Sequence, residues 1–284
     1  MTGVVRGILC DLDGVVYRGD AACPGAAEGL ASAREAGVQI LYMTNNASRT
    51  PEAVADQLSG LGVPAGPADV LTASQVAAVE VASLQADGRL TIGQDRPVLA
   101  LGGRGVGEAL EEQHLDWITT VEQRERSGST GIAGVAAVVQ GYGPQIDVQD
   151  LTEAAYAIRE GAAWIATNDD TTLPTARGLA VGNGSLVAAV RSATGAEPTV
   201  VGKPHRNAYQ VALDRLGLPA GECLMIGDRL DTDIAGAARA GIPSALVLTG
   251  VSTAEEVPAL PQSLRPGHVV GTIVELAHLW GRDA

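Results

Sequence analysis

Four short clusters of polar residues carry side chains that could together hold an anion and a divalent cation. They are Asp11-Leu12-Asp13-Gly14, Thr44-Asn45-Asn46, Gly202-Lys203-Pro204, and Gly227-Asp228 with Asp231 and Asp233. Carboxylates in the first and last clusters would repel one another unless a cation lay among them, and oxygen ligands suit a hard ion such as Mg²⁺. Lys203, Thr44 and the backbone N–H groups at Asn45 and after Asp11 supply donors for an anion. These residue types together predict a phosphoryl-transfer site.

Each cluster directly follows a short apolar run that is typical of a buried strand. We expect strands at 4–10, 38–43, 198–201, 223–227 and 244–248, and helices at 24–36, 51–60, 205–216 and 231–240. Apolar strands separated by helices indicate a parallel sheet with helices on both faces, and the crevice of such a sheet lies beyond the carboxyl ends of its strands. The sequence therefore predicts a Rossmann-like, doubly wound α/β core in which the four clusters converge at one edge.

The middle of the chain has its own alternation of strands and helices. We expect strands at 97–101, 135–139 and 163–166, and helices at 105–113 and 148–160. This pattern predicts two domains: a core formed by residues 1–74 and 186–284, and an inserted α/β domain at 75–185. Residues 250–268, which contain three prolines, are expected to form a surface excursion before the last helix.

The composition of the 284 residues bounds the possible functions. Hydrophobic residues make 46% of the chain and charged residues 18%, which is typical of a globular protein. The formal net charge of −14 disfavours binding to nucleic acids and to anionic membranes. No apolar run approaches the ~20 residues of a membrane-spanning helix, and the N-terminus lacks the pattern of a signal peptide. Three widely spaced cysteines argue against a disulfide framework or a zinc site, so we predict a cytoplasmic protein.

Lys203 is the only lysine in the chain, since every other basic residue is an arginine. A compact ammonium and a planar guanidinium are not interchangeable in a crowded site. A single lysine inside one of the four clusters therefore indicates a functional role, although a solvated surface lysine is the simple alternative. By the same reasoning, Asp11 and Asp13 could be a turn with a helix cap, and Asp231 is better explained as a helix N-cap than as a site residue.

The motifs resemble those of the haloacid dehalogenase superfamily, and within it those of the NagD-like phosphatases, which carry a large inserted cap. The matching segments are DLDGVVYRG (11–19), YMTNNASRT (42–50), TNDDTTLPT (167–175), VGNGSL (181–186), VGKP (201–204) and GDRLDTDIAGA (227–237). The first motif is weak alone, but the ordered set is highly specific and spans almost the whole chain. The resemblance implies a HAD-like catalytic core with a C2-type α/β cap.

The resemblance also implies a role for each residue that matches a motif. Asp11 would be the nucleophile that forms an aspartyl-phosphate, and Asp13 would be the general acid and base. Thr44 and the Asn45 amide would hold the phosphoryl oxygens, and Lys203 would neutralise charge on the nucleophile and the phosphate.

Magnesium is the cofactor that the resemblance implies. Its ligands would be an oxygen of Asp11, the main-chain carbonyl of Asp13 and Asp228, with Asp233 supporting the ion through water. In the predicted cap, Asn168 and Asp170 are candidate substrate residues, for which an ordinary turn is an equally good interpretation.

The leading hypothesis is a Mg²⁺-dependent phosphatase of small phosphorylated metabolites, with sugar, glycerol, nucleotide, pyridoxal and aryl phosphates all open as substrates. Asn46 is a further candidate substrate residue. A hydrolase that uses the Asp nucleophile on carbon, a phosphomutase, and a phosphometabolite-binding protein without activity are the alternatives. Asp13, Asp228 and Lys203 argue against the first and the last of these. The resemblance further implies a possible homodimer formed through the cap.

Overall fold

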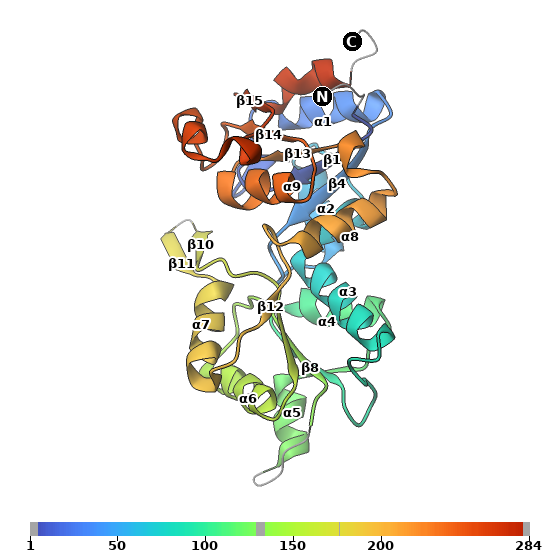
Figure 1. Cartoon of the computed structure of the whole chain (residues 1–284), viewed down its shortest axis with the longest axis vertical. Coiled ribbons are helices and arrows are strands. Elements are labelled where there is room, and N and C mark those ends of the chain that lie inside the picture. Colours follow the sequence, from blue (N-terminus) through green and yellow to red (C-terminus); the bar gives the residue numbers. More distant parts are fainter. Residues whose placement is uncertain (1–4, 129–133, 176, 281–284) are drawn as a thin grey trace. The chain divides into compact units, whose positions relative to one another are not determined.

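The computed structural model describes residues 5–128, 134–175 and 177–280, and it divides into two compact units. The first unit comprises Met1–Thr44, Pro51–Leu71 and Lys203–Ala284, and the second comprises Asn45–Thr50 and Thr72–Gly202. In Figure 1 the first unit therefore takes its elements from both ends of the colour scale, blue and orange to red, and the second from the middle.

The first unit is built on a six-stranded sheet with the order β15-β14-β13-β1-β4-β5. Its strands are β1 (Gly7–Asp11), β4 (Gln39–Thr44), β5 (Val70–Thr72), β13 (Cys223–Gly227), β14 (Ser244–Val247) and β15 (His268–Val270). Strand β1 lies between β4 and β13 and runs parallel to both. Every residue of β1 and β13 is buried, as expected for parallel strands that are covered on both faces.

Helices cover both faces of this sheet. On one face, strand residues such as Ile8 and Ile226 pack with Leu30 of α1 (Ala26–Glu35), Leu58 of α2 (Pro51–Gly60) and Leu276 of the 3₁₀ segment η6 (Ile273–Leu279). Two further helices, α8 (Arg206–Leu216) and α9 (Ala235–Arg239), pack against each other, and α8 also contacts β4. The doubly wound α/β core predicted from the sequence is thus confirmed.

Short segments complete the first unit. They are β2 (Tyr17–Arg18), β3 (Ala21–Ala22), η1 (Pro67–Asp69), η2 (Ala220–Glu222), η3 (Leu230–Ile234), η4 (Ala254–Ala259) and η5 (Gln262–Leu264). The helix expected at 231–240 begins as the wide π-helical turn η3 before it continues as α9. The last helix expected from the sequence consists of the 3₁₀ segment η6.

The second unit has a five-stranded parallel sheet with the order β12-β9-β8-β6-β7. The strands are β6 (Val98–Leu101), β7 (Trp117–Thr119), β8 (Ala137–Gln140), β9 (Ala163–Ala166) and β12 (Thr199–Val200), and an antiparallel hairpin is formed by β10 (Thr172–Thr175) and β11 (Gly178–Val181). The helices are α3 (Ala73–Ala86), α4 (Arg104–Glu112), α5 (Thr120–Ser127), α6 (Val148–Arg159) and α7 (Asn183–Thr194). Its core includes Leu99, Val138, Ala154 and Trp164.

A strand is present within 198–201, as expected, but it does not belong to the first sheet. The prediction that it pairs in the core sheet was therefore wrong. Strand β12 pairs with β9 in the second unit, with Thr199 opposite Ile165. A two-residue apolar strand fits the edge of either sheet, so the pattern alone does not choose between them. Together with α7, this pairing assigns residues 186–202 to the second unit, whereas the predicted boundary lay at 185.

None of the helices within the described ranges is long and apolar enough to cross a membrane.

Candidate active site

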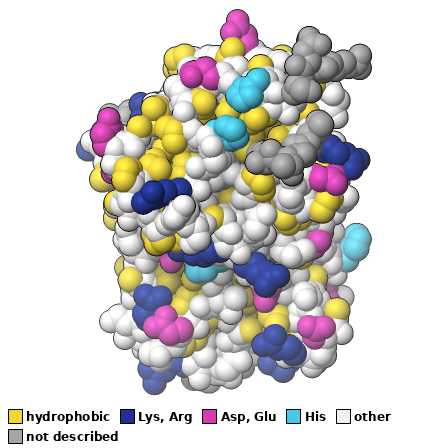
Figure 2. All heavy atoms as spheres, turned by 45° about the horizontal axis from the view of Figure 1, so that its top comes forward, with side chains coloured by type: hydrophobic (Ala, Val, Ile, Leu, Met, Phe, Trp, Pro, Cys, Tyr) yellow, Lys and Arg dark blue, Asp and Glu magenta, His cyan; other side chains and the backbone are white. Residues whose placement is uncertain are grey.

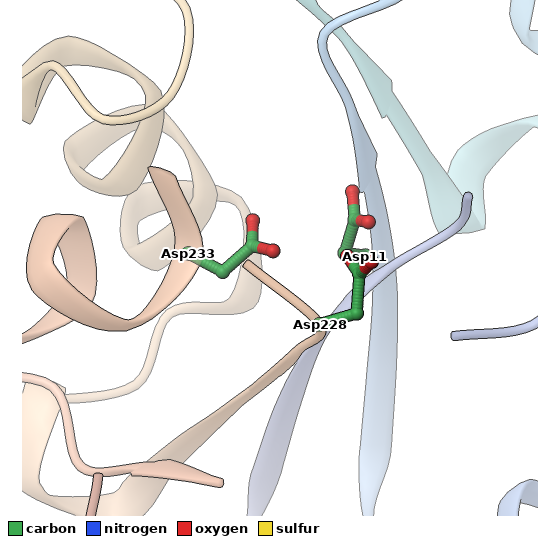
Figure 3. A group of neighbouring side chains, drawn as sticks. All are labelled: Asp11, Asp228 and Asp233. Atoms are coloured by element: carbon green, nitrogen blue, oxygen red, sulfur yellow. The ribbon is translucent and has the colours of Figure 1, made fainter. Parts of the chain in front are cut away.

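Three aspartates come together at the carboxyl ends of two neighbouring strands. Asp11 is the last residue of β1, Asp228 directly follows β13, and Asp233 lies on η3. One carboxylate oxygen from each lies within 4.8 Å of the others, and Figure 3 shows the three side chains grouped together. All three residues are buried. The structure thus brings together the first and last polar clusters of the sequence.

Lys203 also lies in this group. Among the described residues, it is the only buried cationic side chain. Its side chain is 4% exposed, and its ammonium Nζ forms ion pairs with Asp11 Oδ1 and, at 2.8 Å, with Asp233 Oδ1. Burial disfavours the ammonium, but the attraction of Asp11 and Asp233 prevails and holds the pKa of Lys203 well above its ordinary value. Lys203 is therefore charged at neutral pH.

The carboxylates outnumber the ammonium, and burial makes the excess charge costly. Burial raises the pKa of Asp11 well above its ordinary value, against the opposing effect of Lys203. Burial and the nearby Asp233 raise the pKa of Asp228 to about 6. A divalent cation among the three would remove this penalty.

The donor set fits magnesium. Asp228 Oδ1 is buried and has no hydrogen-bond partner in the described part of the chain, so this oxygen is oriented for a ligand that the protein does not supply. The surrounding donors are carboxylate oxygens, which suit a hard cation.

Asp13 and Thr44 lie beside this group on the same unit. Gly14, with a φ of 82°, turns the chain sharply after Asp13, and its N–H donates to the carbonyl of Tyr17 at 2.8 Å. Asp13 is exposed, in contrast to Asp11 two residues earlier. Thr44 is buried at the end of β4, one residue beyond Met43, which is the register partner of Asp11.

Asn45 and Asn46 belong to the second unit, together with the predicted cap residues. Asn45 Nδ2 donates to Asp170 Oδ2 at 3.0 Å, and Asn168 Nδ2 donates to the Asn45 carbonyl at 2.7 Å. The N–H of Asp170 donates in turn to Asn168 Oδ1 at 3.2 Å. Asn46 Oδ1 accepts from the N–H and the hydroxyl of Ser48, both at 2.9 Å. The structure therefore links Asn45, Asn168 and Asp170, and uses Asn46 to form a local turn.

Glycines of the second unit allow the segment Asn45–Thr50 to pack closely against them. A Cβ at Gly103 would lie 2.7 Å from Ser48 Cα, and a Cβ at Gly141 would lie 2.9 Å from Ala47 Cβ. The hydroxyl of Ser74 donates to the Ala47 carbonyl at 2.8 Å. Gly103 and Gly141 thus provide a surface on which a neighbouring backbone packs closely.

Asn183 was missed as a functional candidate by the sequence analysis. It is buried at the start of α7, and its Nδ2 donates to the Asn168 carbonyl at 2.7 Å. The VGNGSL segment signalled its position but not its contact, because the partner is a backbone carbonyl 15 residues away in the chain. Asn183 therefore supports the loop that carries Asn168 and Asp170.

The chain matches two known protein families. A family described as haloacid dehalogenase-like hydrolase matches residues 8–116, and a family described as HAD-hydrolase-like matches residues 200–276. Among curated proteins, the chain is 41% identical over 262 residues to D-glycerol 3-phosphate phosphatase of Mycobacterium tuberculosis, a match that covers 92% of the chain and 68% of the relative. It is 34% identical over 270 residues to 5'-nucleotidase YutF of Bacillus subtilis, which covers 95% and 96%, respectively.

Solved structures show the same similarity. The glycerol phosphate phosphatase of Mycobacterium tuberculosis in complex with magnesium has a TM-score of 0.83 and 39% sequence identity, over 98% of this chain and 77% of that one. NagD from E. coli has a TM-score of 0.81 and 26% identity, over 96% and 98% of the two chains.

Proposed function

Because the chain belongs to the haloacid dehalogenase-like hydrolases, in their NagD-like branch, we propose that it hydrolyses small phosphomonoesters with Mg²⁺ through an aspartyl-phosphate on Asp11. The family expected from the motifs is confirmed, as are the phosphatase class and the magnesium cofactor. The buried cluster of Asp11, Asp228, Asp233 and Lys203 is the observation that carries the assignment of residues.

Asp11 is the residue best suited to attack phosphorus. Its ion pair with Lys203 opposes the effect of burial on its pKa and thus favours the ionised carboxylate, which is the nucleophilic form, at the end of β1. The attack forms a bond between an Asp11 oxygen and phosphorus, and breaks the bond from phosphorus to the leaving oxygen. Water then attacks the aspartyl-phosphate, which releases phosphate and regenerates Asp11.

Asp13 would carry the protons of both steps. It would protonate the leaving oxygen, and it would then accept the proton of the attacking water. Its exposure supports this role, because an exposed carboxyl group can exchange protons with solvent while the buried Asp11 is kept for attack on phosphorus.

Magnesium would be held by Asp11, by the Asp13 carbonyl and by Asp228, and would stabilise the negative charge of the phosphoryl group. The contacts of Asp233 support an indirect role. Its Oδ1 accepts from Lys203 at 2.8 Å and its Oδ2 accepts from the Arg229 N–H at 3.2 Å, so both of its oxygens are already engaged. Asp233 would therefore hold Lys203 and reach the ion through water. The Thr44 hydroxyl, the Asn45 N–H and Lys203 would bind the phosphoryl oxygens.

The second unit would select the leaving group, as a cap. The side-chain amide of Asn168 is used at both ends for backbone contacts, and Asn46 holds its own turn, so these two residues would shape the loops. Asp170 presents a carboxylate next to the Asn45 amide. This charge would favour leaving groups with hydroxyl donors and disfavour those with a second phosphate.

Partners and location follow from the same features. We expect small phosphorylated metabolites as substrates. Figure 2 shows acidic and basic side chains interspersed on the viewed face. The formal net charge of −14 supports the expectation that nucleic acid is not a partner. Leu179 and Val181 on the exposed β11 support a homodimer formed through the cap. Three unpaired cysteines support a cytoplasmic location.

Phosphate release from a panel of phosphomonoesters, in Mg²⁺ and in EDTA, tests the proposed function. We expect release that depends on Mg²⁺, is fastest for one compound, and is abolished in a folded Asp11→Asn variant. Activity that survives EDTA would favour attack on carbon. Tight metabolite binding without release would favour a binding protein. Turnover by Asp11→Asn would overturn the proposed aspartyl-phosphate intermediate.

A further inference from the structure

The loop at 249–252 wraps around Asp228, although the sequence predicted only a surface excursion in this region. The N–H of Val251 donates to Asp228 Oδ2 at 2.7 Å, and the N–H of Ser252 donates to the Asp228 carbonyl at 3.0 Å. The loop thus holds both the side chain and the backbone of Asp228.

The same loop is itself tied down on both sides. The Thr249 hydroxyl donates to the Gly14 carbonyl at 2.7 Å, and Arg18 Nη2 donates to the Gly250 carbonyl at 2.7 Å. On the other side, Ser252 Oγ accepts from the Leu230 N–H at 3.1 Å. These contacts connect the loop to the turn that follows Asp11 and to the segment that carries Asp233.

Gly250 is the point at which the loop comes closest to Asp228. A Cβ at this position would overlap three atoms of the Asp228 side chain, Cβ, Cγ and Oδ2. Gly250 is not among the glycines with a positive φ, so the left-handed region does not explain the glycine at this position. The reason for glycine here is therefore the space that the Asp228 carboxyl group occupies.

The two oxygens of Asp228 differ as a result. Oδ2 is fixed by the Val251 N–H, whereas Oδ1 is buried and has no hydrogen-bond partner in the described ranges. A carboxylate that is bound at one oxygen and open at the other has a defined direction for a cation. Hydrogen bonds of this kind to a metal ligand orient the ligand and contribute to metal affinity.

We propose that the 249–252 loop is a positioning element for the magnesium ion, and that Gly250 sets the affinity for the ion by allowing the Val251 N–H to hold Asp228. This inference rests on the proposed function, since it takes Asp228 as a ligand. Gly250 would act through Asp228 and would touch neither the substrate nor the phosphoryl group.

The test compares Mg²⁺ binding by four proteins, without substrate, in isothermal titration calorimetry: wild type, Gly250→Ala, Gly267→Ala and Asp228→Asn. Gly267 is the matched control, because a Cβ there would meet its nearest neighbour, the Ser244 carbonyl, at an ordinary 3.6 Å, and because its φ is not positive. We expect the Mg²⁺ dissociation constant to rise about 10- to 100-fold in Gly250→Ala and to stay unchanged in Gly267→Ala. Asp228→Asn should lose measurable binding.

Activity against Mg²⁺ concentration separates positioning from a general effect on the fold. Gly250→Ala should need more Mg²⁺ but reach a kcat close to that of wild type when saturated. If Gly250→Ala does not fold in EDTA, the milder Thr249→Val variant takes its place. An unchanged dissociation constant, or a lower kcat with an unchanged Mg²⁺ requirement, would overturn the proposed role of the loop. If wild type fails to bind Mg²⁺, or if Asp228→Asn binds equally well, the assignment of Asp228 fails instead.

Discussion

The pH dependence of stability should reveal the strain that Asp228 imposes on the magnesium-free protein. Burial and Asp233 raise the pKa of this carboxyl group to about 6, from an ordinary 3.8. Between these two pH values the folded state keeps a proton that the unfolded state has lost. The free energy of unfolding therefore falls as pH rises through this window, because the unfolded state binds fewer protons.

The size of the effect follows from the shift. About two pKa units, at 1.36 kcal/mol each, give a loss of roughly 3 kcal/mol between about pH 4 and pH 6. Asp228→Asn has no proton to lose and should be free of this loss. We expect the stability of Asp228→Asn relative to wild type to increase by roughly 3 kcal/mol over the same range.

Urea unfolding in EDTA at a series of pH values measures this difference. Comparison of the two proteins at each pH cancels the titration of groups that lie far from Asp228. Saturating Mg²⁺ should stabilise wild type near neutral pH and leave Asp228→Asn unaffected, because the cation favours the ionised carboxylate. A difference between the two proteins that stays constant from pH 4 to pH 7 would refute the argument that Asp228 is held at an energetic cost.

Two further variants test other parts of the site. Lys203→Met should destabilise the protein by about 3–5 kcal/mol at pH 8, because it leaves buried carboxylates without their cation, and the loss should shrink at pH 5 as a carboxylate takes up a proton. Urea unfolding at both pH values measures this, and an equal loss at both would contradict it. Asn183→Ala should lower the free energy of unfolding by about 1–3 kcal/mol, because the Asn168 carbonyl loses a buried donor. The same change should raise KM more than it lowers kcat. Ser192→Ala, which removes an exposed hydroxyl on the same helix, is the control, and equal effects of the two changes would exclude a special role of Asn183.

The convergence of the polar residues at the strand ends was predictable, because parallel strands place their carboxyl ends at the same edge of the sheet. Once residues 4–10 and 223–227 are recognised as adjacent buried strands, Asp11 and Asp228 must emerge at the same edge. The predicted helix at 51–60 and the strand at 223–227 match α2 and β13 to the residue.

Other features left no usable pattern in the sequence. The first half of α3 is buried on nearly all sides, so it lacks an apolar stripe, and the predicted domain boundary fell inside it. The contact of Gly250 with Asp228 uses a backbone N–H and the absence of a side chain, and neither is visible as a residue type. Asn45 was grouped with Thr44 by adjacency, but its hydrogen bonds within the second unit depend on residues more than 100 positions away.

Lys203 carries the only side-chain primary amine of the chain, and this amine is enclosed by two carboxylates. Reagents that acylate amines therefore have a single side-chain target, and it lies inside the candidate site. In the folded protein that amine is protonated and shielded, so its acylation should be slow, and it should become fast when the core opens. In a mass spectrum, the acylation of Lys203 would add one mass increment beyond that of the α-amino group. This increment would report the opening of the site, because there is no other lysine to obscure the signal.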